Sequence, residues 1–201
     1  TNTALLIDGK LFKTGSSVDT EVEHGSFSYH HSANGTNFQM LGGAHGCILG
    51  CFGAAGGRTP DANMYHTYDI TGQFEAADQS ARQLFPLRDY SVNGFICFGD
   101  GAYPRGPNML KGIIGPANAM EKEFNHACNK VRVAVEHIFH VLVSNFPYVD
   151  TARKMKIMLQ PVALKVKCAV IFHNWHTCIY GNQISEYFGV CPPSLAQYLA
   201  L

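Results

Sequence analysis

Three acidic residues stand beside apolar segments, and together they suit a metal-dependent reaction. Asp8 follows the short apolar run at 3–7, and Asp100 follows the run at 94–98. Glu136 lies later, in a segment with helical periodicity. Acids carried by strands and by a packed helix can share one site for a divalent cation, because carboxylate oxygens are the ligands that Mg²⁺ prefers. Such a site supports phosphoryl transfer, in which two ions about 3.5–4 Å apart activate the attacking oxygen and neutralise the leaving oxygen.

Each of these acids also has a purely structural explanation. Asp8 and Asp100 both stand next to a glycine, and an aspartate in a glycine turn often caps backbone N–H groups. Glu136 lies beside the apolar stripe of its helix, where burial is costly without a partner. Arg132, one turn earlier, can supply that partner as an i,i+4 ion pair. The residues alone leave both explanations open.

Taken in order, these segments resemble the DDE catalytic domain of Harbinger-type (PIF/Harbinger) transposases and of the nucleases derived from them. The resemblance covers roughly residues 5–174 and is more specific than any single motif. The resemblance implies that Asp8 bridges two Mg²⁺ or Mn²⁺ ions, that Asp100 binds one, and that Glu136 binds the other. It also implies direct attack of water or a 3′-hydroxyl on a DNA phosphate. The matching segments are Asp8-Gly9, Gly99-Asp100-Gly101-Ala102-Tyr103-Pro104, Arg132-Val133-Ala134-Val135-Glu136, GGRTPDANMY and CAVIFHN.

Three further residues are candidates beside this triad. The family has an acid comparable to Asp61 close to the site, although here Asp61 can also serve in the first turn of a helix, stabilised by the helix dipole. Tyr103 and Arg132 can position Asp100 and Glu136, or contact phosphate. Asp61, Tyr103 and Arg132 are therefore predicted to support the triad.

Departures from the family pattern favour a second interpretation. Val143 stands where the family's glutamate helix commonly carries a basic residue, and the segment GGAHGC lacks the acid often found at the first hairpin turn. Both departures weaken DNA contact more than metal binding. A domesticated domain that no longer cuts, and that binds DNA or a protein instead, is the alternative. The helix-turn-helix region of a complete transposase is not found in this sequence, so a separate DNA-binding partner protein is a further expectation.

Composition predicts one domain over residues 1–201. The chain is 46% hydrophobic, enough for one sizeable core, and its net charge is zero, so bulk electrostatics gives no general attraction to nucleic acid. Residues 1–99 hold nine acids and five Lys or Arg, whereas residues 100–201 hold six acids and ten Lys or Arg. A run of cations met by no acid can form a phosphate-facing patch or simply a solvated face. These cations are Arg153, Lys154, Lys156, Lys165 and Lys167.

Cysteine usage and hydropathy predict an intracellular protein, in the nucleus or in both nucleus and cytoplasm. The seven cysteines lie mostly in apolar runs, as buried thiols do in a reducing compartment. The sequence shows neither a signal peptide nor an apolar run of membrane-spanning length, so no membrane partner is expected. Histidines and cysteines cluster twice, but neither cluster has zinc spacing. Cys47 and Cys51 are better explained as core positions on the same face of one strand.

The apolar pattern predicts a mixed α/β sheet with helices on both faces, which is the ribonuclease H-like layout that the resemblance also implies. Strands are expected at 3–7, at 94–98, and as two antiparallel runs within 37–55 that turn at Gly46. Residues 10–25 are expected to form a loop or an edge, and residues 108–114 a short helix or turn.

Helical spacing predicts the remaining elements. Helices are expected at 60–68, where Thr59 can cap the first turn, and at 74–84. A long amphipathic helix is expected at 119–144, and a last, largely buried helix at 162–180. His173 and Asn174 are predicted to have a structural role, ending the buried helix by hydrogen bonding.

Overall fold

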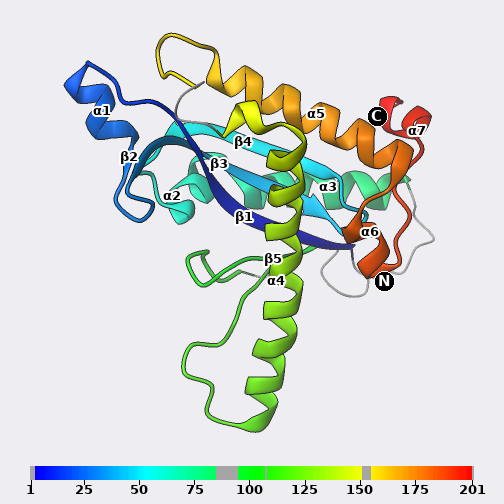
Figure 1. The fold of residues 1–201 in the computed structure, drawn as a ribbon. Coiled ribbons are helices and arrows are strands. Elements are labelled where there is room, and N and C mark those ends of the chain that lie inside the picture. The colour runs from blue at the N-terminus through cyan, green and yellow to red at the C-terminus, as the bar shows by residue number, and fades with distance from the viewer. Residues whose placement is uncertain (1–2, 85–94, 107, 151–154, 201) are drawn as a thin grey trace.

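A mixed sheet forms the frame of the protein (Figure 1). The computed structural model describes residues 3–84, 95–106, 108–150 and 155–200. Strand β3 lies antiparallel between β1 and β4, and β5 runs parallel to both β1 and β6. The strands are β1 (Thr3–Lys13), β2 (Phe27–Ser28), β3 (Ala33–Gly43), β4 (Ile48–Gly56), β5 (Phe95–Phe98) and β6 (Met109–Leu110).

Strand β1 is longer than the sequence pattern predicts. It continues past Asp8 to Lys13, because its backbone stays paired with β3 as far as Lys13 opposite Gly35. The loop or edge expected at 10–25 is therefore only partly right: residues 10–13 are strand, paired with β3 and beyond the part of β1 that pairs with β5, and residues 14–19 lie outside the helices and strands. After this connection comes a short helix, α1 (Thr20–Ser26), which Asp19 caps at its N-terminus. The predicted hairpin is confirmed, with Gly46 at a φ of +82° in the turn between β3 and β4.

Strands β5 and β6 show one confirmed and one wrong expectation. The strand at 95–98 is confirmed, and Gly94 lies outside the described residues. The short helix or turn expected at 108–114 is wrong, since Met109 and Leu110 extend the sheet in parallel with β5. The buried side chain of Met109 explains this outcome, because pairing with β5 places it in the same core cluster as Cys97.

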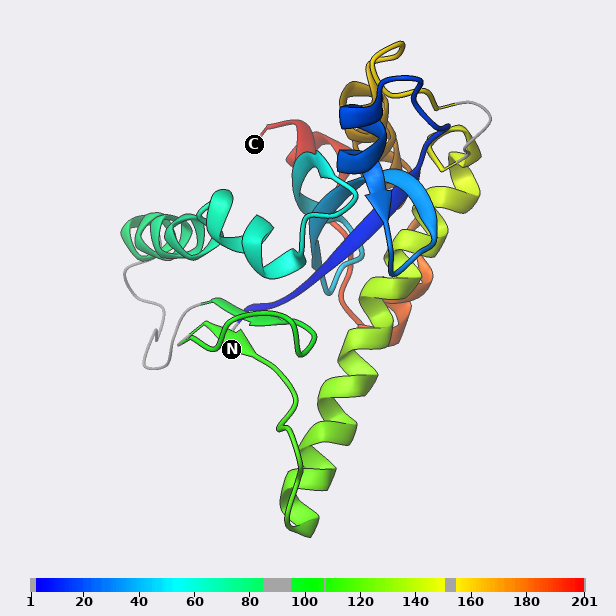
Figure 2. The ribbon, with the colours of Figure 1, turned by 90° about the vertical axis from the view of Figure 1, so that its left-hand side faces the viewer.

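Helices cover both faces of this sheet, as Figure 2 shows. Helix α2 begins one residue after Pro60, and no side chain caps it, so the expected Thr59 cap is wrong. Helix α3 begins at Ile70 rather than near residue 74, because Ile70 and Phe74 are both buried in one cluster. The long helix at 119–144 and the helix at 162–180 are confirmed. The helices are α2 (Asp61–Thr67), α3 (Ile70–Leu84), α4 (Ala119–Asn145), the 3₁₀ turn η1 (Pro147–Val149), α5 (Val162–Tyr180), α6 (Gln183–Phe188) and α7 (Leu195–Leu199).

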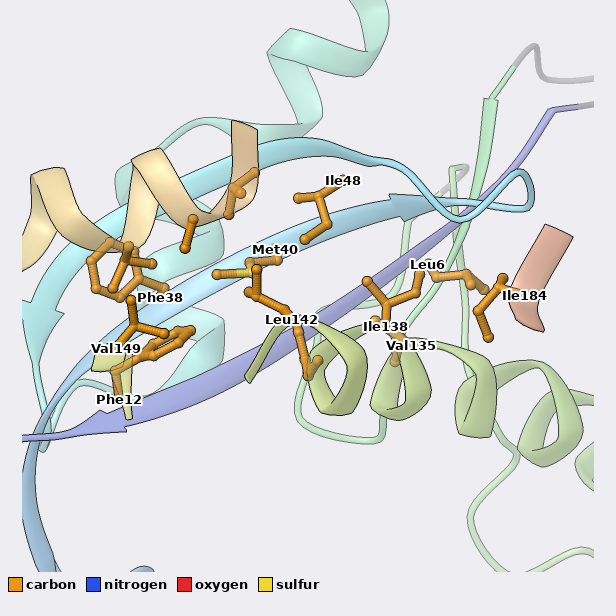
Figure 3. Packing of buried hydrophobic residues seen from close by; sticks show 14 of the residues in the cluster. Leu6, Phe12, Phe38, Met40, Ile48, Val135, Ile138, Leu142, Val149 and Ile184 are labelled. Atoms are coloured by element: carbon orange, nitrogen blue, oxygen red, sulfur yellow. The ribbon is translucent and has the colours of Figure 1, made fainter. Parts of the chain in front are cut away.

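Two apolar clusters hold the helices to the sheet. The larger one joins alternate side chains of β1 and β3 to α4 and α5, as Figure 3 shows for Leu6, Met40 and Ile138. The smaller one places α2 and α3 on the opposite face, through residues such as Ile7 and Ile70. Because the sheet is covered on both faces, the middle of β1 is held rigidly. No helix in the described residues has the length and apolar character needed to cross a membrane.

Helix α5 differs from expectation in two ways. It is not largely buried, since Leu164 and Ile179 are 59% and 55% exposed on the side away from the core. His173 and Asn174 do not end it, because the helix continues to Tyr180. Their predicted structural role is confirmed: both are buried and hydrogen-bond the turn before β4. Cys47 lies in this turn, so Cys47 and Cys51 are not two positions of one strand.

Candidate active site

Asp8 lies in the middle of β1, not at its end as the sequence pattern suggested. It pairs with Met40 of β3 and, by strand alternation, shares a sheet face with Leu6 and Phe12 beneath α4. One carboxylate oxygen, Oδ1, accepts a hydrogen bond from the N–H of Gly9 at 2.9 Å. The carboxyl group is thus carried by a strand that is paired with β3 both before and after Asp8.

Asp100 follows β5, the parallel neighbour of β1. The two strands are in register up to Leu6 opposite Phe98, so the chain leaves β5 close to Asp8. Asp100 Oδ1 accepts a hydrogen bond from the N–H of Ala102 at 2.8 Å, which closes the turn. The turn is also held by Lys111, the residue after β6, whose Nζ donates to the main-chain oxygens of Gly101, at 3.0 Å, and of Tyr103. The turn-capping role considered from sequence is therefore present.

Asp61 approaches β1 from the opposite sheet face, at the first residue of α2. A Cβ atom on Gly9 would lie 2.1 Å from Asp61 Oδ1, so only glycine leaves space for this carboxylate. Gln39, which pairs with Gly9, donates from Nε2 to the main-chain oxygen of Asp61 at 3.2 Å and to Tyr103 Oη at 2.9 Å. Gln39 thereby ties α2 and the turn after β5 to the central strands.

Tyr103 is fully buried, with 0% of its surface exposed. Its ring contacts that of Tyr65 edge-on, with centroids 5.9 Å apart, and burial raises the pKa of its hydroxyl. A side chain enclosed in this way does not reach a phosphate, so phosphate contact by Tyr103 is a wrong expectation. Its position is that of a residue that anchors the turn carrying Asp100.

Asp8, Asp61 and Asp100 lie close enough together for their charges to interact. Burial raises the pKa of Asp8 to about 7, and the negative charges of Asp100 and Asp61 add to the effect; the Gly9 hydrogen bond and Arg132 oppose it. Burial also raises the pKa of Asp61, again with a contribution from Asp100. Gathering these like charges costs free energy that a cation would recover. Carboxylate oxygens whose negative charge is not neutralised by neighbouring cations are suitable ligands for Mg²⁺ or Mn²⁺.

Glu136 lies on α4, in the wall of a hollow that Gly9 also borders. Its Oε1 lies 2.7 Å from Arg132 Nη1, and the two side chains are 48% and 39% exposed, respectively. The i,i+4 ion pair considered from sequence is therefore formed. In the described part of the chain, no three His, Cys, Asp or Glu side chains converge closely enough to hold one ion. The structure thus brings Asp8, Asp61 and Asp100 into electrostatic contact, and it pairs Glu136 with Arg132.

Two hollows meet at the middle of β1 and share Gly9, Leu11 and His31 in their walls. The first, here named the Arg58 hollow, has a volume of about 470 Å³. Its wall also includes Tyr29, His30, Arg58, Asp61 and Ala102. The second, the Lys13 hollow, has a volume of about 440 Å³. Its wall also includes Lys10, Lys13, Glu136, His140 and Asp150.

Positive groups border the acids in these hollows. Burial lowers the pKa of His31, and His30, Lys10 and Lys13 lower it further, whereas Asp150 opposes them. Lys10 is itself paired with Asp150, at an Nζ to Oδ2 distance of 3.7 Å. Acidic and basic side chains therefore both line the two hollows, a combination suited to a phosphate backbone with bound cations.

The basic run predicted from sequence is only partly described. Arg153 and Lys154 lie outside the described residues. Lys156 and Lys167 are exposed, and Lys165 Nζ donates to Gln160 Oε1 at 2.7 Å. A phosphate-facing role for this run stays a prediction.

Several residues of the site were missed by sequence reasoning. The position of Gln39 carries a signal, because it is a polar residue between the buried Phe38 and Met40 in a strand covered on both faces. The histidine pair His30-His31 and Arg58 have a weaker signal, since loops give no periodic pattern. Only the tertiary structure reveals that they border the acids.

One of three comparisons with known proteins found a match. A family model described as DDE superfamily endonuclease matches residues 7–174. The matched segment includes Asp8, Asp61, Asp100 and Glu136. No curated protein and no solved structure matches the chain.

Proposed function

The chain belongs to the DDE superfamily endonuclease family, and on that premise we propose that it is a divalent-metal-dependent nuclease of the Harbinger transposase type, acting on DNA phosphodiesters. The Gly99-Asp100-Gly101-Ala102-Tyr103-Pro104 and Arg132-to-Glu136 segments support the subtype. An antiparallel meander continued by parallel strands, with helices on both faces, supports a ribonuclease H-like layout.

Asp8, Asp100 and Glu136 would hold the metal ions. When bound, Mg²⁺ or Mn²⁺ supplies Lewis-acid stabilisation of phosphate oxygens and lowers the pKa of an attacking water. Asp8 would contribute a carboxylate fixed in the sheet, and Asp100 one fixed by its turn. Glu136 would exchange its ion pair with Arg132 for metal, which leaves the Arg132 guanidinium for a phosphate oxygen. Asp61 and Tyr103 would position their neighbours.

One observation carries this proposal. The Asp8 carboxyl has its pKa raised to about 7 by burial and by two neighbouring aspartates, within a segment that matches an endonuclease family. A partly buried acid beside other acids lowers stability, so this arrangement points to a role in function rather than in folding.

Nicking of supercoiled plasmid DNA in Mn²⁺ tests the proposal. We expect the wild-type chain to nick, and Asp100→Asn and Asp8→Asn each to lose roughly 100-fold or more of the rate. Asp19→Asn is the matched control, because asparagine caps the N-terminus of α1 about as well as aspartate does. Nicking that survives in both site variants would refute the assignment.

A catalytically silent domain that binds DNA or a protein is the second candidate. The Arg132–Glu136 ion pair favours it, because this pair already satisfies one of the three acids. Zero net charge also favours it over a stand-alone DNA enzyme, and a separate DNA-binding protein would then supply affinity. Binding without any nicking in Mn²⁺ or Mg²⁺ would select this candidate.

A further inference from the structure

The Arg58 hollow contains groups that the proposed metal chemistry does not use. Its wall includes Asp61 and, among the groups that this chemistry does not use, Tyr29, His30 and Arg58. Its volume of about 470 Å³ falls within the range of about 300–1,000 Å³ that is usual for small-molecule sites. The hollow therefore has room for one small polar ligand beside the acids.

Tyr29 and Arg58 together form a stacking surface in this wall. Tyr29 is 73% exposed, in the connection between β2 and β3 (Figure 1). Its ring is held by an edge-on contact with Phe27, with centroids 5.3 Å apart, and Arg58 Cζ lies 5.4 Å from the ring centroid. Nucleobases stack on tyrosine rings and on guanidinium planes, and such stacking tolerates any base.

His30 and His31 add hydrogen-bond donors beside this surface. Their rings contact each other edge-on at 4.8 Å, and both line the Arg58 hollow. His31 also lines the Lys13 hollow, so it stands where the two hollows meet at Gly9 and Leu11. Imidazole N–H groups at this point can donate to phosphate oxygens of a strand that passes from one hollow to the other.

We propose that the Arg58 hollow binds one unpaired nucleotide of single-stranded DNA next to the phosphate that is cut. Tyr29 and Arg58 stack its base, and His30 and His31 bind its phosphate. The identity of the ligand rests on the proposed nuclease function of the adjoining acids. The zero net charge of the chain supports stacking as a source of affinity, because bulk charge supplies none.

An unpaired nucleotide fits this hollow better than a duplex does. A base inside a duplex is stacked between its neighbours, so it does not offer a face to Tyr29 unless it leaves the stack. The ligand class is therefore a single strand, or a duplex end with an unpaired base.

Fluorescence anisotropy tests the proposal without any cleavage. A labelled 12-nucleotide single strand and the matching duplex are titrated with the protein in EDTA. We expect Tyr29→Ala to weaken single-strand binding about 5- to 100-fold, as the loss of one stacked base does, and Tyr29→Phe to stay within about twofold of wild type. Tyr187→Ala, on α6, is the control, since Tyr187 is also exposed (60%) and lies outside both hollows.

Arg58 provides an independent variant should Tyr29→Ala alter the loop. Arg58→Gln should weaken single-strand binding, because the guanidinium plane that stacks on the base is lost, and the loss of its positive charge should also lower the salt dependence. Arg58→Lys, which keeps the charge but loses the planar stack, should restore the salt dependence but not the full affinity. The proposal is overturned if Tyr29→Ala binds like Tyr187→Ala, or if Tyr29→Ala weakens duplex and single strand equally.

Two combinations of results distinguish failure of the nuclease proposal from failure of the nucleotide-binding proposal. Single-strand binding that depends on Tyr29, in a protein that never nicks plasmid in Mn²⁺, would support the hollow and reject the nuclease. Nicking that requires Asp100, with single-strand binding unchanged in Tyr29→Ala and Arg58→Gln, would support the nuclease and reject the hollow.

Discussion

Asn174 on α5 and Asp8 on β1 are both polar side chains packed against the sheet, but their surroundings are opposite. Asn174 is 2% exposed; its Oδ1 accepts from the N–H of Ile48 at 2.8 Å, and its Nδ2 donates to the C=O of Ile48 at 2.8 Å and to Tyr198 Oη at 3.1 Å. Asp8 accepts a hydrogen bond from Gly9 and is surrounded by the charges of Asp61 and Asp100.

The difference indicates which of the two side chains contributes to stability and which to chemistry. A neutral amide whose donors and acceptor are all matched fixes the β3–β4 turn against α5 and improves stability. A partly buried acid among other acids does the reverse, because each negative charge raises the free energy of ionising its neighbours. The region around Asn174 is therefore expected to serve stability, and the region around Asp8 to serve metal binding. Substitutions in the two regions can test these two roles separately.

The largest effect is expected at Asn174. Asn174→Ala removes the partners of the Ile48 N–H and C=O groups, and it should lower the free energy of unfolding by about 2–5 kcal/mol. Urea unfolding followed by circular dichroism measures this loss. Asn129→Ala, at an exposed position on α4, is the control. A loss below about 1 kcal/mol would show that Asn174 does not hold the turn.

At Asp8, substitution should change the pH dependence of stability. The folded-state pKa of about 7 lies above the ordinary value of 3.8, so folded protein retains a proton that unfolded protein has lost, and stability falls as pH rises through this window. Relative to wild type, Asp8→Asn should gain about 2–3 kcal/mol between pH 5 and pH 8 in EDTA. Thermal unfolding across this range measures the gain.

Two outcomes sharpen this prediction. Millimolar Mg²⁺ at pH 8 should stabilise wild type but not Asp8→Asn, because a bound cation removes the charge penalty. An Asp8→Asn advantage that is constant between pH 5 and pH 8 would mean that the Asp8 carboxyl is not perturbed.

A smaller effect is expected at Gly9. Gly9→Ala places a methyl group against the Asp61 carboxylate, which would lie 2.1 Å away without movement, and should cost about 1–3 kcal/mol of stability and reduce nicking. Gly25→Ala in α1 is the matched control, since a Cβ there meets no atom within 4 Å. If urea unfolding does not distinguish the two variants, Asp61 has no fixed place beside β1.

The parts of the fold that sequence predicted well are those with strong periodicity. Helix α4 repeats apolar residues such as Val135, Ile138 and Leu142 on one stripe, and its bounds were predicted almost to the residue. The length of β1 and the existence of β6 were not predicted. Both depend on pairing with a distant strand, β3 or β5, which no local pattern reports.

The residues of the candidate site also fall into those that sequence predicted and those that it did not. Asp8, Asp100 and Glu136 were singled out from their types and setting, whereas the approach of Asp61 to Gly9 depends on how α2 crosses β1. Gln39 and Lys111 were overlooked because their roles consist of hydrogen bonds to segments far away in sequence. The sequence thus indicated the acids, but only the fold shows that Asp8 and Asp100 lie near Asp61 while Glu136 pairs with Arg132.

The proposed metal site depends on one claim, that Asp8 gives up a proton to bind a divalent ion. Calorimetric titration with Mn²⁺ at pH 6.5, in two buffers of different ionisation enthalpy, gives the number of protons released per ion bound. A pKa of about 7 predicts release of roughly half a proton to one proton by wild type and by Asp19→Asn, and weaker binding without release by Asp8→Asn. Wild-type binding that releases no proton, or unchanged binding in Asp8→Asn, would contradict the claim.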